Sequence, residues 1–130
     1  MKMAGGYRHY GWECYPYSSK TRSYLRFKGI DHEDIYPTII DFKRIIEKRL
    51  GYVVMPVVIT PDDTTLQDSS AIIDHLEERF PEPSITPQGP KQKLASLLLE
   101  LHADEWLPII AMHTRWNDPQ NSRYADKEFG

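Results

Sequence analysis

The sequence predicts an α/β fold in which strands and helices follow the order β-α-β-α-β-β-α, with one long, kinked helix after them. Three observations support this prediction. Short β-branched and aromatic runs alternate with longer stretches whose apolar residues recur at helical spacing. The last two strand-like runs lie close together and are separated by a proline–aspartate turn. A proline-rich stretch then separates these elements from the final apolar helix.

The first half of the chain contains a predicted strand–helix–strand unit. Residues 7–12 are aromatic and bounded by glycines, which is typical of a short strand. Pro16 can open a helix at its first position, where the missing N–H costs nothing, and Gly29 can end it. Residues 30–36 form the next predicted strand. The two strands are therefore expected to be parallel, with a right-handed connection.

The second half continues with a helix, a hairpin and another helix. The first of these helices ends at Gly51. Residues 53–67 are expected to form a hairpin, whose first strand is interrupted by Pro56. The last helix begins after two residues that can cap it, Asp68 and Ser69. This order of elements is the thioredoxin arrangement.

The chain is expected to have two parts joined by a linker. Residues 1–80 form the first domain. Residues 81–90 contain four prolines, which no helix or central strand can accommodate, and are interpreted as a linker. Residues 91–130 carry a long apolar helix with an expected kink at Pro108. From Asn117 onward the sequence turns polar and predicts a loose tail.

Composition excludes several classes of function. A net charge of −3 offers no electrostatic footprint for nucleic acid. No apolar run approaches the ~18 residues that a membrane span needs, and the single cysteine suits a reducing compartment. The five histidines are not spaced as metal ligands. We therefore expect a cytoplasmic, soluble protein without a metal, a membrane partner or a nucleic-acid partner.

Three segments resemble the glutathione S-transferase superfamily. They are YPYSSKTR at residues 15–22, VMPVV at 54–58 and LQDSSAIIDHLE at 66–77. Their order and spacing make the resemblance specific. It implies a thioredoxin-like, glutathione-binding domain, followed by an incomplete helical C-terminal domain at residues 91–130.

The resemblance assigns glutathione-binding roles to five residues. A cis peptide bond before Pro56 would let the backbone of Met55 pair with a peptide-like ligand; an ordinary edge-strand proline is the alternative. Asp68 and Ser69 would hold the γ-glutamyl end at a helix N-terminus, and Gln67 would assist. A simple helix cap is the alternative for this pair, and the two roles are compatible.

The residue that stabilises the glutathione thiolate is less clearly indicated. Tyr15 stands where the family has a catalytic serine or cysteine. Ser18 is the next hydroxyl on the same helix, and Tyr7 and Tyr10 are others in the first strand. Cys14 lies one residue earlier and could form a mixed disulfide with glutathione. The alternatives are a packing aromatic for the tyrosine and a small buried residue for the cysteine.

The leading functional prediction is a glutathione S-transferase that adds the glutathione thiolate, as co-substrate, to a small electrophile. One alternative is a glutathione-dependent thiol–disulfide oxidoreductase that uses Cys14. Another is a non-catalytic interaction module with the same fold. The apolar stripe from Leu94 to Trp116 needs a partner surface. Either the chain dimerises through this helix, or it is a fragment of a longer protein. Because the resembled family is commonly dimeric, we expect a homodimer or a partner-bound state.

Overall fold

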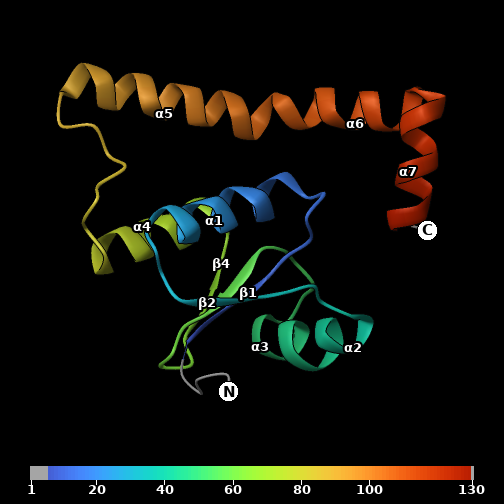
Figure 1. Ribbon diagram of the computed structural model, residues 1–130, viewed down its shortest axis with the longest axis horizontal. Coiled ribbons are helices and arrows are strands. Elements are labelled where there is room, and N and C mark those ends of the chain that lie inside the picture. The colour runs from blue at the N-terminus through green and yellow to red at the C-terminus, as the bar shows by residue number, and fades with distance from the viewer. Residues whose placement is uncertain (1–5, 130) are drawn as a thin grey trace. The chain divides into compact units, whose positions relative to one another are not determined.

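The computed structural model describes residues 6–129 and divides into two compact units. The first unit ends at Ile85, the second begins at Thr86, and each is considered by itself. The first unit contains four strands and three helical regions (Figure 1). In chain order they are β1 (Tyr7–Tyr10), α1 (Pro16–Phe27), β2 (His32–Ile35), the consecutive segments α2 (Ile39–Asp41), η1 (Phe42–Ile46) and α3 (Glu47–Leu50), β3 (Val57–Ile59), β4 (Thr65–Gln67) and α4 (Ser69–Arg79).

The four strands form one mixed sheet in the order β2-β1-β3-β4. Strands β1 and β2 are parallel, whereas β3 is antiparallel to both of its neighbours. Helices α1 and α4 cover one face, and the α2–α3 region covers the other (Figure 1). The predicted thioredoxin-like order, including the parallel strand–helix–strand unit and the hairpin, is therefore confirmed.

Three strands are shorter than the sequence predicts. Strand β1 ends at Tyr10, two residues before its predicted end. Strand β2 spans only His32–Ile35 of the predicted 30–36. Strand β3 begins at Val57 and does not run through Pro56. The proline has no N–H to donate to a neighbouring strand, so regular pairing starts only after it.

Helix α1 ends as the glycine pattern predicts. Gly29 has a φ of 64°, a left-handed conformation that glycine adopts without steric cost. Its N–H donates to the carbonyl of Arg26 at 3.1 Å, and the N–H of Ile30 donates to the carbonyl of Leu25 at 3.0 Å. This pair of bonds is a Schellman motif, which satisfies the last carbonyls and returns the chain to the sheet.

The helix after β2 has the predicted extent but a wider central turn. Thr38 caps it reciprocally with Asp41: the Asp41 N–H donates to the threonine hydroxyl at 3.3 Å, and the Thr38 N–H donates to the carboxylate at 2.8 Å. Segment η1 is a π-helix. Such single wide turns are rare in proteins, and those that do occur are often found at functional sites.

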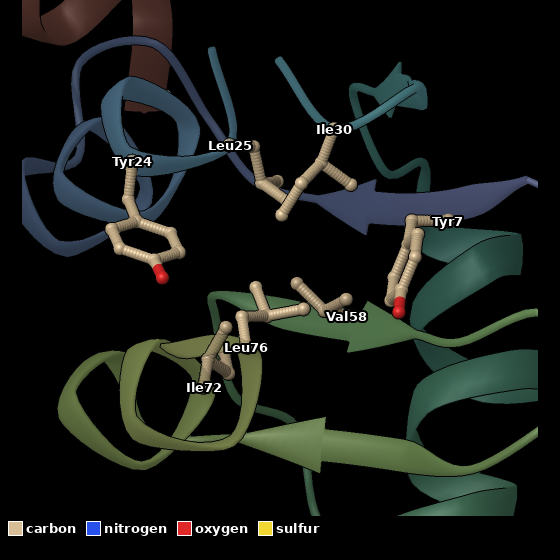
Figure 2. Close-up of a cluster of buried hydrophobic side chains, with 7 residues drawn as sticks. All are labelled: Tyr7, Tyr24, Leu25, Ile30, Val58, Ile72 and Leu76. Carbon is tan, nitrogen blue, oxygen red and sulfur yellow. The ribbon is translucent and has the colours of Figure 1, made fainter. Parts of the chain in front are cut away.

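The core consists of two clusters, one on each face of the sheet. Side chains of β3 alternate between them: Val58 faces α1 and α4, whereas Val57 and Ile59 face the α2–α3 region. This alternation follows from the two-residue period of a strand. The first cluster contains Tyr7, Tyr24, Leu25, Ile30, Val58, Ile72 and Leu76 (Figure 2). Both layers of helices are thus fixed to the sheet by apolar burial.

The second unit contains three helices, α5 (Pro90–Glu105), α6 (Leu107–Asn117) and α7 (Pro119–Phe129). The predicted long helix is bent, and it breaks at Trp106, so that Pro108 lies in the first turn of α6. The predicted loose tail is wrong, since α7 is helical. The Asp118 carboxylate accepts from the Gln120 N–H at 2.7 Å, which caps the helix.

Candidate functional site

The strand registers bring the three motif segments to one end of the sheet. Tyr10 at the end of β1 pairs with Val57, the first residue of β3, and Val57 pairs with Gln67, the last residue of β4. At this end of the sheet, β1 continues into the loop 11–15. Met55 lies just before β3, and Asp68 comes directly after β4. These segments lie far apart in the sequence, so only the sheet makes them neighbours.

The first segment is the loop that leads into α1. Tyr15 is the N-cap residue and has an extended backbone, and its N–H donates to the carbonyl of Trp12 at 3.3 Å. No side chain caps α1, and its first turn contains no acidic residue. The positive end of the helix dipole is therefore not balanced by a local carboxylate, which favours an anion there. Tyr15 and Cys14 are both half-buried beside this turn.

The hydroxyl of Ser18 is not accessible at the N-terminus of α1. The residue is fully buried, and its Oγ lies 2.7 Å from the position that a Cβ on Gly11 would occupy. Within the described residues 6–129, this hydroxyl has no hydrogen-bond partner. The other candidate hydroxyls in β1 are also buried: Tyr7 lies in the cluster under α1 and Tyr10 in the cluster under α3.

The second segment precedes β3. The Met55–Pro56 peptide bond is cis, Pro56 is buried and Met55 is half-buried. Both ladders of β3 begin at Val57, so Met55 lies outside the two registers. Its backbone is thus placed next to the sheet without belonging to its paired rows.

The third segment is the start of α4. Asp68 has a φ of 71°, and its Oδ1 accepts from the N–H groups of Ser70 and Ala71, both at 3.0 Å. Ser69 is buried in the first turn, and the ammonium of Lys20 donates to the Ser70 hydroxyl at 3.1 Å. The turn therefore combines backbone donors, one carboxylate and a nearby cation, a set that suits a zwitterionic group.

A partly buried polar network lies behind the loop, and the sequence does not predict it. His9 on β1 contacts the Asp34 carboxylate through Nδ1 at 2.7 Å and the Thr21 hydroxyl through Nε2 at 2.8 Å. Arg22 donates through Nε to the same carboxylate. The Nη2 of Arg22 donates to the carbonyl of Gly11 at 3.4 Å. A lone histidine carries no spacing signal, and its partners are 12 and 25 residues away along the chain.

The charges in this network shift two pKa values. Burial lowers the pKa of His9 below 6.5, and this effect outweighs the opposing pull of Asp34. Burial raises the pKa of Asp34, but hydrogen bonds from Arg22 and His9 outweigh it and hold that pKa below its ordinary value. At neutral pH the network therefore contains a carboxylate, a guanidinium and a neutral imidazole.

No helix between residues 6 and 129 is long and apolar enough to cross a membrane. Over the same residues, no three histidine, cysteine, aspartate or glutamate side chains come together as a metal site.

The sequence model of the glutathione S-transferase N-terminal domain matches residues 10–84. A curated relative, the stringent starvation protein A homolog of Pasteurella multocida, is 27% identical over 110 residues, which are 82% of this chain and 50% of that protein. The chain thus spans about half the length of the curated relative that it matches.

Solved structures give the same result for the fold. A Tau class glutathione S-transferase from mango, Mangifera indica, superposes with a TM-score of 0.73 at 21% identity, over 97% of this chain and 58% of that one. A glutathione S-transferase from Methylobacterium radiotolerans, in complex with glutathione sulfonate, superposes with a TM-score of 0.67 at 28% identity, over 75% and 46% of the two chains.

Proposed function

Because this chain belongs to the glutathione S-transferase family through its N-terminal domain, we propose that it binds glutathione and activates the thiol for transfer to a small electrophile. The observation that carries the proposal is the convergence of the loop 11–15, Met55 and the start of α4 at one end of the sheet. A related transferase was crystallised with glutathione sulfonate, which supports the same ligand class here.

The γ-glutamyl and cysteinyl parts of glutathione have matching groups in this arrangement. The γ-glutamyl carboxylate suits the first turn of α4, with the buried Ser69, and the adjacent ammonium suits the exposed Asp68 carboxylate. The cysteinyl backbone suits strand-like pairing with Met55. Gln67, the last residue of β4, directly precedes Asp68 and Ser69 and assists them in binding the γ-glutamyl part.

The sulfur suits the uncapped N-terminus of α1, next to Tyr15 and Cys14. There the helix dipole and the tyrosine hydroxyl stabilise the thiolate. The thiol proton leaves to water, and a sulfur lone pair then forms a bond to the electrophilic carbon. The leaving group departs with the electron pair of its broken bond. The buried Ser18 does not contact the sulfur in this proposal.

Calorimetric titration of the chain with reduced glutathione tests the binding half. Asp68→Asn is the informative variant, because asparagine also caps helices and tolerates positive φ but lacks the charge that pairs with an ammonium. We expect its Kd to rise about tenfold, equivalent to about 1.4 kcal/mol. Asp118→Asn, the same change at the cap of α7, is the matched control and should leave the Kd unchanged.

Steady-state kinetics with an activated chloroarene tests the transfer half. Tyr15→Phe should lower kcat and leave the Kd for S-methylglutathione, which has no ionisable thiol, unchanged, because only the hydroxyl is removed. Intact-mass analysis after treatment with oxidised glutathione addresses the oxidoreductase alternative, in which Cys14 would carry a glutathione adduct. Absence of glutathione binding at millimolar concentration would overturn both enzyme readings and leave the interaction module.

We also propose that the chain forms a homodimer through α5 and α6. Both helices carry large exposed apolar side chains, an arrangement that favours association. These residues include Leu94, Leu97, Leu98, Leu101, Ile109, Met112 and Trp116. Light scattering at high protein concentration tests the proposal, and a single monomer peak there would overturn it.

A further inference from the structure

A continuous chain of partly buried polar contacts ends on the loop that carries Cys14 and Tyr15. It begins at the Thr21 hydroxyl in α1, passes through His9 on β1 and Asp34 on β2, and returns to α1 at Arg22. The guanidinium of Arg22 then donates to the carbonyl of Gly11, the first residue of the loop. Three elements of the fold are thus connected to one backbone group.

The hydrogen-bonding capacity of the network allows one consistent assignment of its protons. The Asp34 carboxylate can only accept, so the proton of the neutral His9 lies on Nδ1, and Nε2 accepts from the hydroxyl of Thr21. The charged or titratable groups that act on His9 are Asp34, Arg22 and His32. The imidazole is wholly buried, and the Arg22 side chain is only 9% exposed.

The backbone at Gly11 is held tightly. Its N–H donates to the carbonyl of Ile35 at 3.1 Å, and its carbonyl accepts from Arg22. A Cβ at this residue would lie 2.7 Å from the Ser18 side chain and 2.9 Å from the imidazole of His9. The loop therefore leaves the sheet in a direction that the network and this close approach set together.

Stability alone is a weak explanation for such a network. Buried ionic groups lose their hydration, and apolar residues of similar volume often stabilise a fold at least as well. A fully satisfied polar network does impose one particular geometry on its neighbours. Here the geometry acts on the loop 11–15, which precedes α1.

We propose that His9, Asp34 and Arg22 are positioning residues that orient the loop 11–15, and with it the groups that stabilise the glutathione thiolate. This inference rests on the proposed function, since it assigns the network a role in thiol activation. Among residues 6–129, no hydrogen bond or ion pair of the network reaches Met55 or the start of α4. It should thus affect the sulfur and leave the binding of the peptide part intact.

The test compares two ligands in the full chain: reduced glutathione and S-methylglutathione, which has no ionisable thiol. The pKa of bound glutathione is followed by the ultraviolet absorbance of its thiolate, and the Kd of each ligand by calorimetry. Asp34→Asn keeps the shape of the side chain but removes the charge. Arg22→Lys keeps the charge but loses the guanidinium fork that joins Asp34 to Gly11.

Arg26→Gln is the matched control. Arg26 approaches the same Asp34 oxygen, at 3.7 Å, but is 68% exposed. We expect both network variants to raise the pKa of the bound thiol by about one unit, a tenfold loss of thiolate at a given pH. Their Kd for S-methylglutathione should stay within about twofold of the wild-type value. The control should change neither quantity.

Three results would overturn the inference. One is an unchanged thiol pKa in both folded variants. Another is an equal loss of affinity for both ligands, which indicates general damage to the fold. If the wild-type chain binds neither ligand, the proposed function itself fails, and this inference fails with it. Asp34 is 31% exposed, so Asp34→Asn should disturb the fold little. It therefore tests the inference even if Arg22→Lys does not fold.

Discussion

Replacing Lys28 with methionine should destabilise the first unit, because this lysine is a wholly buried donor with three acceptors. Its ammonium lies 2.7 Å from the Glu77 carboxylate and donates to the carbonyls of Phe80 at 2.6 Å and Pro83 at 2.7 Å. Methionine fills nearly the same space but cannot donate. The variant therefore isolates the loss of the charged hydrogen bonds from the loss of packing.

The pKa of Glu77 sets the magnitude of this effect. Burial raises that pKa, but hydrogen bonds from Lys28, from Tyr24 and from the N–H of Ile85 outweigh burial and lower it from 4.5 to about 2. At about 1.4 kcal/mol for each pKa unit, these three donors and the hydroxyl of Ser84 together stabilise the carboxylate by about 3 kcal/mol. The carboxylate is 18% exposed, and solvent screening reduces the contribution of Lys28 to about 2 kcal/mol.

Urea unfolding monitored by circular dichroism measures the effect. A loss of about 2 kcal/mol corresponds to a fall in Tm of about 10 °C for a unit of this size. The pH dependence is a second signature. The lowered pKa of Glu77 stabilises the wild type fully above pH 4.5, and this stability is lost as the pH falls towards 2. Lys28→Met should show a weaker loss over that interval.

Lys48→Met is the control, since Lys48 is exposed on α3. It should leave the free energy of unfolding within about 0.5 kcal/mol of the wild type. If Lys28→Met behaves like this control, the ion pair contributes nothing and the reasoning from burial is wrong. A double-mutant cycle with Glu77→Gln should give a coupling of about 1 to 3 kcal/mol, and an additive result would also refute it.

Three further predictions concern other parts of the chain. Burial lowers the pKa of His9, so the unfolded chain takes up a proton at a higher pH than the folded chain does. The free energy of unfolding should therefore decline as the pH falls below 6.5. If this free energy depends on pH in His9→Gln as it does in the wild type, the assignment is wrong. Gly11→Ala should cost about 1 to 3 kcal/mol in urea unfolding, because the added Cβ meets Ser18 at 2.7 Å; a neutral change would mean that the loop relaxes freely. Asp118→Ala should reduce the helicity of α7 in circular dichroism by removing a cap worth about 1 kcal/mol, and equal helicity would refute the capping role.

Sequence reasoning predicted the elements of the first unit well, because their signals are local. Pro16 and Gly29 bound α1 as expected, and the alternation of Val57, Val58 and Ile59 between two cores follows from strand periodicity alone. The polar composition from Asn117 onward predicts a loose tail, but Pro119–Phe129 is helical. Asp118 caps this helix and Ala125 is buried, so packing and capping together hold a helix that composition does not indicate.

The expected linker also begins later than its prolines indicate. Lys28 and Glu77 bind the backbone at Phe80, Pro83 and Ile85, so the first compact unit extends to Ile85. These contacts join residues 52 to 55 positions apart, or a side chain to a backbone group eight residues away. No local pattern encodes such a pairing.

The candidate site shows the same division. Met55, Asp68 and Ser69 are recognisable in the sequence because a proline before a β-branched run and a cap before an apolar helix are short-range features. Their meeting beside the loop 11–15 depends on the registers of three strands, and registers are set by the packing of whole sheet faces. The burial of Ser18 and the network around His9 arise in the same way. Local chemistry therefore identified the groups, and only tertiary packing decided which of them meet.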